Sequence, residues 1–456
     1  MVRRRGCGPS GTRVFDTGSA LPILYPYYSP LGEPMTAIQK SGLLLAAAIL
    51  AMNTAHAQSW ELGPFVRPLD APAIEPNRFY TFTTPATGQK TLWDNLAVFD
   101  PGAAIAADGE VAVLFRAEAS SAAGQSPESA SRLGLATSKD GLFFTVHGAP
   151  VLSPEDSPPP APGSRYGLRG ARIVVGPHGS YVMTYTESAA SRAAGGQPQD
   201  RICIATSSNL RNWTRRGPAF AASLPSAAGK AARINDGFGA ILTELRHGRL
   251  QAAKLHGRYW MYWGEQAVHL ATSPDLIHWT PVLDQRSGRP LTVLSPRAGH
   301  FDSGAATVGP PPLLTRRGIL LIYNGENSLR GVSNANNTQV TDAPTPALPP
   351  SPSRSRHSGS AGVSLLQPDA PRLAADPTLR PGAYAVGEAL FSAADPTRLL
   401  KRANHPVLQP VWPYERDGRR SAGGVFAEGM VVWQGQWLLY YGAADSVIGV
   451  ARAPLR

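Results

Sequence analysis

Five runs of β-forming residues in this 456-residue chain each end in an acidic residue, a repetition that could serve acid–base chemistry. The five acids are Glu118, Glu187, Glu265, Glu326 and Asp445. Cleavage of a glycosidic bond needs one carboxylic acid to protonate the leaving oxygen and one carboxylate to activate water or attack carbon. The composition of these strand ends therefore fits glycoside cleavage.

A second set of polar residues stands where the strand before each run would begin. These residues are Asp94, Asn95, Asp100, Arg169, Arg172, Asn235, Asp236, Asp302, Ser303 and Glu428. In two consecutive antiparallel strands, the second strand ends at the edge where the first began. We therefore expect both sets to line one mouth, as a pocket of carboxylates and arginines. An acid at a strand end can instead cap a turn, and we expect a structural role for Glu118 and Glu187.

Repeated segments predict the elements that position these side chains. Residues 135–145, 204–214 and 270–280 share one pattern, at spacings of 69 and 66 residues. Each pattern predicts a strand, a tight Asp or Asn turn and a second strand opened by an aromatic residue. Five units of roughly 70 residues, each with about four short strands, are typical of an all-β, five-bladed β-propeller.

The chain divides into three parts at the level of composition. Residues 1–57 are an upstream segment followed by a signal peptide at 35–57, with one lysine, an apolar run and an Ala-His-Ala cleavage site. Residues 58–456 form the propeller, and residues 60–91 supply the outer strand that closes the ring. Residues 328–381, rich in Ser, Pro, Ala and Asn, are predicted to be a disordered insertion. A secreted or periplasmic protein is expected, with no membrane contact after cleavage.

Charge and cysteine content argue against a nucleic-acid partner, a disulfide and a cysteine-based metal site. The formal net charge is +11, and residues 1–57 hold five basic and two acidic side chains, which leaves about +8 for the remainder. The arginines are scattered and no nucleic-acid motif accompanies them, so no nucleic-acid partner is expected. Cys203 stands alone after residue 57, which excludes a disulfide there and a cysteine-based metal site. No metal or cofactor is expected.

Several of these segments, in this order, resemble glycoside hydrolase family 130, which comprises β-mannoside phosphorylases and related hydrolases. The resemblance rests on residues 94–102, 259–265, 293–297, 301–303 with 309–312, and 441–446. It implies a five-bladed propeller that acts on β-linked mannosides by inversion, with sugar-binding acids at the blade mouths.

The chain departs from the family pattern at one position of consequence. The family carries Glu-Asp-Pro-Arg in the inner strand of blade two, and that Asp is the proton donor of the phosphorylases. Here the four residues are Arg169, Gly170, Ala171 and Arg172. Glycine cannot move a proton, so the role must pass to another carboxyl group or be lost. Glu155 and Asp156 are nearby in sequence but lie in a Pro-rich loop.

Glu265 and Asp302 are the predicted acid/base pair of an exported hydrolase acting on an oligosaccharide. The predicted substrate-binding residues are Asp94, Asn95, Asp100, Arg116, Arg172, Asp236, Lys254, Trp263, Glu428 and Asp445. The basic residues among them could bind phosphate or an acidic substituent, or could neutralise the acids. Trp263 and Trp93 could stack on sugar or pack in the core. A non-catalytic carbohydrate-binding propeller and a phosphorylase remain the alternatives.

The signal peptide gives the first testable prediction. Secreted protein should begin at Gln58, because cleavage follows Ala57 in the Ala-His-Ala site. N-terminal sequencing of exported material checks this, and a mature chain that still carries residues 2–34 would contradict it.

Overall fold

Strands make up nearly all the regular structure of this protein in a computed structural model. The structure describes residues 60–85, 88–120, 131–156, 165–190, 199–221, 237–329, 373–420 and 422–455. Within these ranges, helical turns are confined to Pro154–Asp156, Pro177–Gly179 and α2 (Pro413–Arg416). No helix of the described residues is long and apolar enough to cross a membrane. The prediction of an all-β fold is confirmed.

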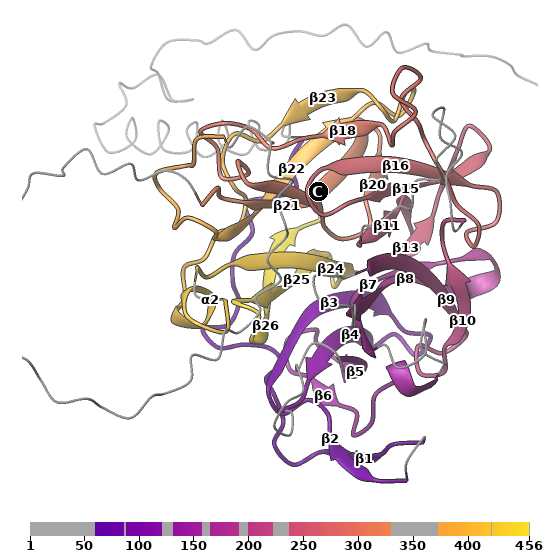
Figure 1. Cartoon of the computed structure of the whole chain (residues 1–456), viewed down its shortest axis with the longest axis vertical. Helices are drawn as coiled ribbons and strands as arrows, with labels where there is room; N and C mark the ends of the chain where they lie inside the picture. The colour runs from indigo at the N-terminus through magenta and orange to yellow at the C-terminus, as the bar shows by residue number, and fades with distance from the viewer. Residues whose placement is uncertain are drawn as a thin grey trace, which may run out of the picture. The chain divides into compact units, whose positions relative to one another are not determined.

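The strands fall into five successive antiparallel groups, which we call blades one to five (Figure 1). Blade one holds β3 (Ala97–Ile105), β4 (Val111–Glu118), β5 (Arg132–Ser138) and β6 (Thr145–Val146). Blade two holds β7 (Arg165–Val175), β8 (Tyr181–Ala190), β9 (Gln199–Ser207) and β10 (Thr214–Pro218). Blade three holds β11 (Gly239–Ile241), β15 (Arg258–Trp263), β16 (Val268–Ser273) and β17 (Thr280–Pro281), with the short strands β12 (Thr243–Arg246), β13 (Arg249–Ala252), β14 (Lys254–Leu255) and β18 (Thr292–Leu294) beside them. Blade four holds β19 (Ala305–Val308), β20 (Leu313–Thr315), β21 (Gly318–Glu326), β22 (Tyr384–Phe391) and β23 (Leu399–Arg402), and blade five holds β24 (Val425–Trp433), β25 (Gln436–Ala443) and β26 (Val447–Pro454).

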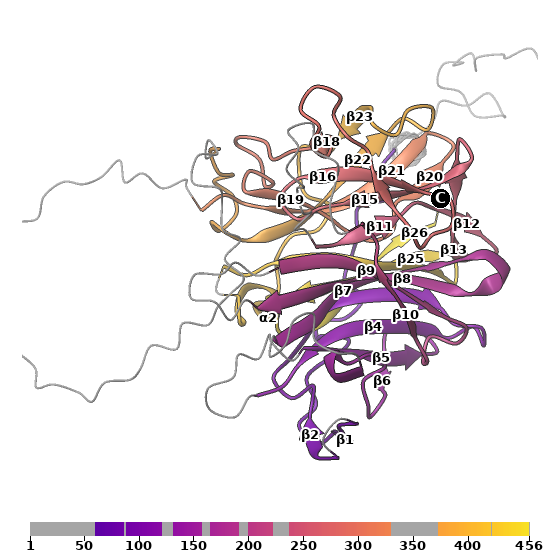
Figure 2. The same cartoon turned by 45° about the vertical axis from the view of Figure 1, so that its right-hand side comes forward.

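The blades contact one another in the order of a closed ring. Neighbouring blades touch through β3 and β7, β7 and β11, β15 and β19, β21 and β24, and finally β24 and β3. Figures 1 and 2 show β24 and β25 between β3 and the strands of blade four. Parallel pairing of β13 with β7 and of β12 with β20 also joins blades two and four into one eleven-stranded sheet through the β12–β13 hairpin, whereas the other strands of blade three form a separate six-stranded sheet. The five blades are therefore defined by strand order and contacts rather than by separate sheets.

Hydrophobic packing follows the same order. Five clusters of buried apolar side chains lie in the described part, one between each pair of neighbouring blades. Each sheet thus buries both faces, as the long apolar runs of β4, β21 and β25 require. Burial on both faces fixes strand register, and register determines which residues reach the mouth.

The segment before β1 (Thr81–Thr83) and β2 (Lys90–Leu92) closes the ring. Val66 and Ile74 form β-bridges with Arg452 and Ile448 of the last strand, β26. The backbone N–H of Leu62 donates to the buried carboxylate of Glu388, at 3.0 Å from Oε2. Residues 62–74 thus lie against the last strand through isolated bridges but form no strand of their own, and β1 and β2 pair only with each other, so the predicted outer strand is not formed.

The repeated Asp or Asn turn identified in the sequence forms the same structure in three blades. In blade three, Ser273 Oγ donates to Asp275 Oδ1, and Asp275 Oδ1 accepts the N–H groups of Ile277 and His278. These hydrogen bonds lower the pKa of Asp275, although its partial burial acts in the opposite direction. Asp140 and Asn209 make the equivalent bonds in blades one and two. Each of these turns needs a Ser followed two residues later by Asp or Asn. These residues therefore recur and make the repeat visible in the sequence.

The predicted insertion is narrower than residues 328–381, and this boundary needs correction. Ser328 is buried and its N–H donates to Ser303 Oγ at 3.0 Å. At the other end, Asn327 Nδ2 donates to the carbonyls of Asp376 and Leu379, and Asn327 Oδ1 accepts the N–H of Asp376. Residues 330–372 lie outside the described residues. The composition of residues 373–381 concealed this docking, because its partners are backbone groups rather than apolar side chains.

Asn327 should therefore be a stability determinant. Asn327→Ala removes all the side-chain hydrogen bonds of a buried residue, including those with Ser303, Asp376 and Leu379, so the free energy of unfolding should fall by about 1–3 kcal/mol. Urea unfolding checks this, with Asn212→Ala at an exposed turn as the control. Equal stabilities of the two variants would show that the docking is unimportant.

Candidate active site

Three inner strands carry a β-bulge at the same level of the propeller axis. The register shifts between Phe99 and Gly102 in β3, between Arg169 and Arg172 in β7, and between Ala427 and Gly429 in β24. The bulged residues include Asp100 and Glu428, two predicted site residues. Bulges turn side chains out of the regular alternation, and here they direct charged groups toward the axis.

Two glycines let the inner strands approach closely at these bulges. A Cβ on Gly102 would lie 2.3 Å from the carbonyl oxygen of Ala171 in blade two. A Cβ on Gly429 would lie 2.7 Å from the carbonyl oxygen of Pro101 in blade one. Backbone contact between blades one, two and five thus depends on residues without side chains.

Arg172 lies at the centre of this layer with its side chain 0% exposed. Its Nη2 donates to the carbonyl of Val308, the last residue of β19, and its Nε to that of Gly309, the next residue. Its Nη1 donates to Gly170 O. Nη1 also lies 2.7 Å from Glu428 Oε1, a close charge contact without hydrogen-bond alignment. Burial raises the pKa of Glu428 and Arg172 opposes this rise. Arg172 therefore ties blades two, four and five together.

Glu265 and Glu326 occupy equivalent positions after β15 and at the end of β21. The inner strand β19 lies between them, since Gly304 N–H donates to Glu326 O on one side and Thr307 Oγ1 donates to Glu265 O on the other. Both side chains reach solvent, at 26% exposed for Glu265 and 20% for Glu326. The structure thus brings two solvent-accessible carboxyl groups to the mouth of blades three and four.

Arg169 of β7 holds the Glu265 carboxylate. Its Nη2 lies 2.5 Å from Glu265 Oε1 and 2.5 Å from Asp200 Oδ2, and its Nε donates to Ser188 Oγ. Burial would raise the pKa of Asp200, but Arg169 and Ser188 bring it below its usual value. Arg169 stands where the family pattern has an acid, so this charge reversal supplies a cation to Glu265.

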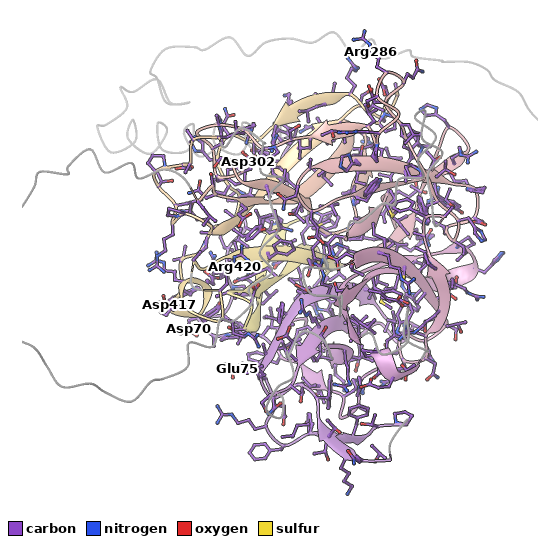
Figure 3. The ribbon with its side chains drawn as sticks, viewed as in Figure 1. Asp70, Glu75, Arg286, Asp302, Asp417 and Arg420 are labelled. Atoms are coloured by element: carbon purple, nitrogen blue, oxygen red, sulfur yellow. The ribbon has the colours of Figure 1, made fainter. Side chains whose placement is uncertain are left out.

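Glu326 has a different environment from Glu265. Burial raises the pKa of Glu326, and Arg420 and a hydrogen bond from Tyr384 oppose the rise without cancelling it. Arg420 Nη2 lies 2.9 Å from Glu326 Oε1, and its guanidinium lies over the Tyr384 ring at 4.4 Å. Arg420 belongs to the loop after α2 and lies nearer the middle of the view than Asp417 of the same loop (Figure 3). Glu326 was quoted in the sequence pattern but not selected as catalytic. The sequence signal that could have identified Glu326 is that it ends its β-rich run as Glu265 does.

Blades one and five contribute the remaining charges of the mouth. Arg116 lies 2.5 Å from Glu118 and 3.6 Å from Asp100, and Arg419 lies 2.8 Å from Glu118. Asp445 is more exposed and lies 3.8 Å from Arg420. Burial raises the pKa of Asp100, which Arg116 and Arg169 oppose. Asp100, Arg116 and Asp445 are thus brought together as the sequence predicted, and sugar contact by them stays a prediction. The side chains of Glu428 and Arg172 are 0% exposed, so the substrate contact predicted for these two residues is not supported by their positions.

Asp302 lies where it has no access to substrate. It is 0% exposed, and it accepts hydrogen bonds from Arg297, Arg402 and Tyr323, at 2.8, 2.6 and 2.6 Å from Oδ2. Figure 3 shows Asp302 among the strands of blade four. With both neighbouring cations and a phenol already bound to it, Asp302 anchors the outer part of the blade. Its predicted place in the acid/base pair is therefore not supported by its position.

Trp263 and Lys254 are also placed away from the mouth. Trp263 is buried and packs against Phe220 and His269, with ring centroids 5.0 and 4.8 Å apart. Lys254 pairs with Tyr259 at the opposite end of β15 from Glu265, about 20 Å along the strand by its rise per residue. The substrate-binding role predicted for these two residues is therefore not supported by their positions, and Trp93 likewise packs in the core against Phe115.

Three further predicted residues have separate outcomes. Asp94 is buried with no hydrogen-bond partner for either carboxylate oxygen, and burial raises its pKa to about 7. Asn95 Nδ2 donates to Ser120 Oγ at 2.7 Å. Asp236 lies outside the described residues. Glu155, the weaker substitute for the missing acid, is paired with Arg132.

The position of the missing acid, Gly170, is filled by a neighbour. Gly170 has a φ of 64°, and a Cβ there would lie 2.2 Å from Cε1 of Phe238. The Phe238 ring lies 4.5 Å from the Arg169 guanidinium and 4.4 Å from that of Arg172. No side chain can therefore be added at 170 without displacing this ring.

Other candidate features of the described residues do not compete with this mouth. No group of three or more His, Cys, Asp or Glu side chains within the described ranges is arranged to hold a metal ion. A surface cavity of about 390 Å³ is lined by Arg67, His405, Val411 and their neighbours, none of which belongs to the acid pair. We therefore treat the carboxylates around β19 as the candidate active site.

Comparison with known proteins gives the family. The family model described as beta-1,4-mannooligosaccharide phosphorylase matches residues 77–336 and 377–456. The chain belongs to glycoside hydrolase family 130. A 1,2-beta-oligomannan phosphorylase of Thermoanaerobacter sp. (strain X514) is 28% identical over 361 residues, which cover 79% of this chain and 90% of that protein. The resemblance inferred from the sequence is confirmed.

Two solved structures of family 130 type are similar in fold and sequence. A glycosyl hydrolase from Bacteroides ovatus is 37% identical with a TM-score of 0.69, covering 87% of this chain and 95% of that one. A structure reported for the family 130 hydrolases that target β-1,2 mannosidic linkages in Candida mannan is 36% identical with a TM-score of 0.69, covering 86% and 94%. Family 130 enzymes act on mannosides, so the coarse functional prediction is confirmed.

The axial pair allows a direct test of the site's foundation. Arg172→Met leaves Glu428 buried without its countercharge, so the free energy of unfolding should fall by about 3–5 kcal/mol. Arg172→Met combined with Glu428→Gln should lose less than the single variant. Denaturant unfolding measures both, and an Arg172→Met variant as stable as the parent would refute the role given to this residue.

Proposed function

We propose that this chain is an exported glycoside hydrolase that cleaves β-mannosidic linkages, with Glu326 as general acid and Glu265 as general base. The proposal rests on the arrangement of Glu265 and Glu326 at the mouth. The two carboxyl groups lie on either side of β19, and burial raises the pKa of Glu326. An acid catalyst must be protonated near neutral pH, whereas the base must be ionised, so unequal environments suit the two roles.

The spacing of the pair supports inversion. Glu265 and Glu326 are separated by two strand spacings, which is about 10 Å between backbones. Inverting glycosidases hold their carboxyl groups roughly 6.5–9.5 Å apart because a water molecule must fit, whereas retaining enzymes hold them about 5 Å apart. A backbone separation of about 10 Å leaves room for the wider of these two carboxyl spacings, and on this ground we propose inversion by direct attack of water.

The ion pairs of the mouth favour water over phosphate as the acceptor. Arg169, Arg420 and Arg116 each lie within 3 Å of a protein carboxylate, on Glu265, Glu326 and Glu118 respectively. Phosphate would have to compete with these carboxylates for the guanidinium groups that bind anions best. Hydrolysis needs no such displacement.

Sequence relationships support a β-1,2-linked mannoside as substrate. The hydrolases described with the 36% identical structure target that linkage, and the Thermoanaerobacter relative is a 1,2-beta-oligomannan phosphorylase. The same relative makes phosphorolysis the second candidate. The signal peptide at residues 35–57 favours hydrolysis, because an exported enzyme meets polymeric glycan outside the cytoplasm.

Glutamine variants test the pair. Glu326→Gln and Glu265→Gln should each lower kcat for β-1,2-mannobiose by about 10²–10⁴-fold, because each removes proton transfer but keeps the side-chain shape. Mannose release and calorimetric binding are measured together. Glu187→Gln is the matched control, since Glu187 lies on β8, the equivalent strand of blade two, but is paired with Arg201 and Arg215.

Two outcomes would overturn this assignment. A parent protein that binds mannobiose without cleaving it is a carbohydrate-binding propeller. A parent that cleaves while both glutamine variants remain as active as Glu187→Gln uses other residues.

The pH profile gives a further prediction. Arg420 and Tyr384 face Glu326 and lower its raised pKa, and Asp445 faces Arg420 from blade five. Arg420→Met removes one lowering contribution, so the pKa of Glu326 should rise further. Because the general acid works only when protonated, the alkaline limb of the kcat profile should move to higher pH.

Arg211→Met is the control for this profile, as Arg211 is exposed and contacts His147. A shift of the alkaline limb to lower pH in Arg420→Met would exclude Glu326 as the acid.

A further inference from the structure

Phe238 has a backbone conformation that large residues rarely adopt. Its φ is 56°, in the left-handed region normally used by glycine. The conformation is fixed at both ends, because its N–H donates to Thr186 Oγ1 at 3.0 Å and its carbonyl accepts the N–H of Gly264 at 3.0 Å. Strain of this kind persists where surrounding contacts enforce it, and it concentrates at functional sites.

The backbone carbonyl and the ring of Phe238 both connect this residue to Glu265. The carbonyl holds Gly264, the residue immediately before Glu265. The ring packs against the guanidinium of Arg169, which in turn donates to Glu265 Oε1. Phe238 thus acts on the backbone and on the carboxylate of one glutamate. Phe426 supports the ring from blade five, with centroids 5.8 Å apart.

We propose that Phe238 is a positioning residue for Glu265 and that Gly170 is its obligatory partner. The ring of Phe238 occupies the space that any side chain at 170 would need, as the 2.2 Å approach of a Cβ to Cε1 shows. A residue other than glycine at 170 pushes the ring away from Arg169 and releases the glutamate. Positions 169, 170 and 238 therefore form one interlocked unit, and its catalytic part rests on the function proposed above for Glu265.

Activity of position 238 variants tests the positioning role. Phe238→Leu keeps an apolar side chain but removes the flat face beneath Arg169, so kcat should fall about 10- to 100-fold, as expected for a misplaced catalytic group. KM should change less than kcat, since Phe238 is buried and does not itself contact substrate. Phe220→Leu, which disturbs a buried aromatic that packs on Trp263, should leave kcat near the parent value.

A double-mutant cycle separates positioning from general loss of packing. Arg169→Met combined with Phe238→Leu should be no slower than Arg169→Met alone, because both changes break the same link to Glu265. Independent, multiplying losses would overturn the proposal, as would a Phe238→Leu variant with the kcat of the parent.

The steric part is tested without any activity. Gly170→Ala should lower the thermal unfolding temperature, and Phe238→Ala should lower it through the lost ring. The double variant should be clearly more stable than the sum of the two losses predicts, because removal of the ring makes room for the new methyl group. Additive losses would contradict the interlock. If the parent cleaves no mannoside, the function proposed above is wrong. The unfolding temperatures of the single and double variants still decide whether positions 170 and 238 interlock.

Discussion

The buried guanidinium of Arg172 is the constraint that the other parts of the mouth satisfy. Its three nitrogens bond carbonyls of blades two and four, and its charge lies against Glu428 of blade five. A charge so far from water is tolerated only with close partners. The bulge in β24 brings Glu428 to the axis, and the bulge in β7 brings Gly170 O within reach of Arg172. The bulges that shape the inner strands are therefore the same features that provide the buried charge of Arg172 with its partners.

Charge balance around this centre explains how the mouth could work. Arg116, Arg169, Arg172 and Arg420 each meet a carboxylate of the protein, and those carboxylates differ in how deeply they are buried. Glu428 is enclosed completely, whereas Glu265 and Glu326 retain access to solvent. The loss of the blade-two acid at Gly170 is consistent with this arrangement, because the ring of Phe238 and the reversed charge at Arg169 use that space to hold Glu265.

Periodic features were predictable from the sequence, and isolated contacts were not. The Ser-x-Asp or Ser-x-Asn turns recur in three copies and the acid of the second strand recurs in five, so they predicted the blades and the mouth. Asp302 also stood at the start of an inner strand, but Arg297 and Arg402 enclose it through contacts that no spacing reveals. Lys254 lies in the short β14–β15 hairpin, far from the mouth, and its residue type gave no sign of that position. Trp263 precedes Glu265 by two residues. Its place in the sequence fitted both stacking on sugar and packing in the core, so the sequence could not decide between the two.

The central claim is that water, activated by Glu265, displaces the leaving group with inversion. Proton NMR of the first turnovers of β-1,2-mannobiose in phosphate buffer tests this most directly, because it identifies both the acceptor and the anomer. The account predicts that each cleavage adds one α-mannose from the non-reducing sugar, so that α-mannose exceeds the anomeric mixture contributed by the reducing-end sugar, in amounts that do not depend on phosphate. Accumulation of mannose 1-phosphate, or an excess of β-mannose over that mixture, would contradict it.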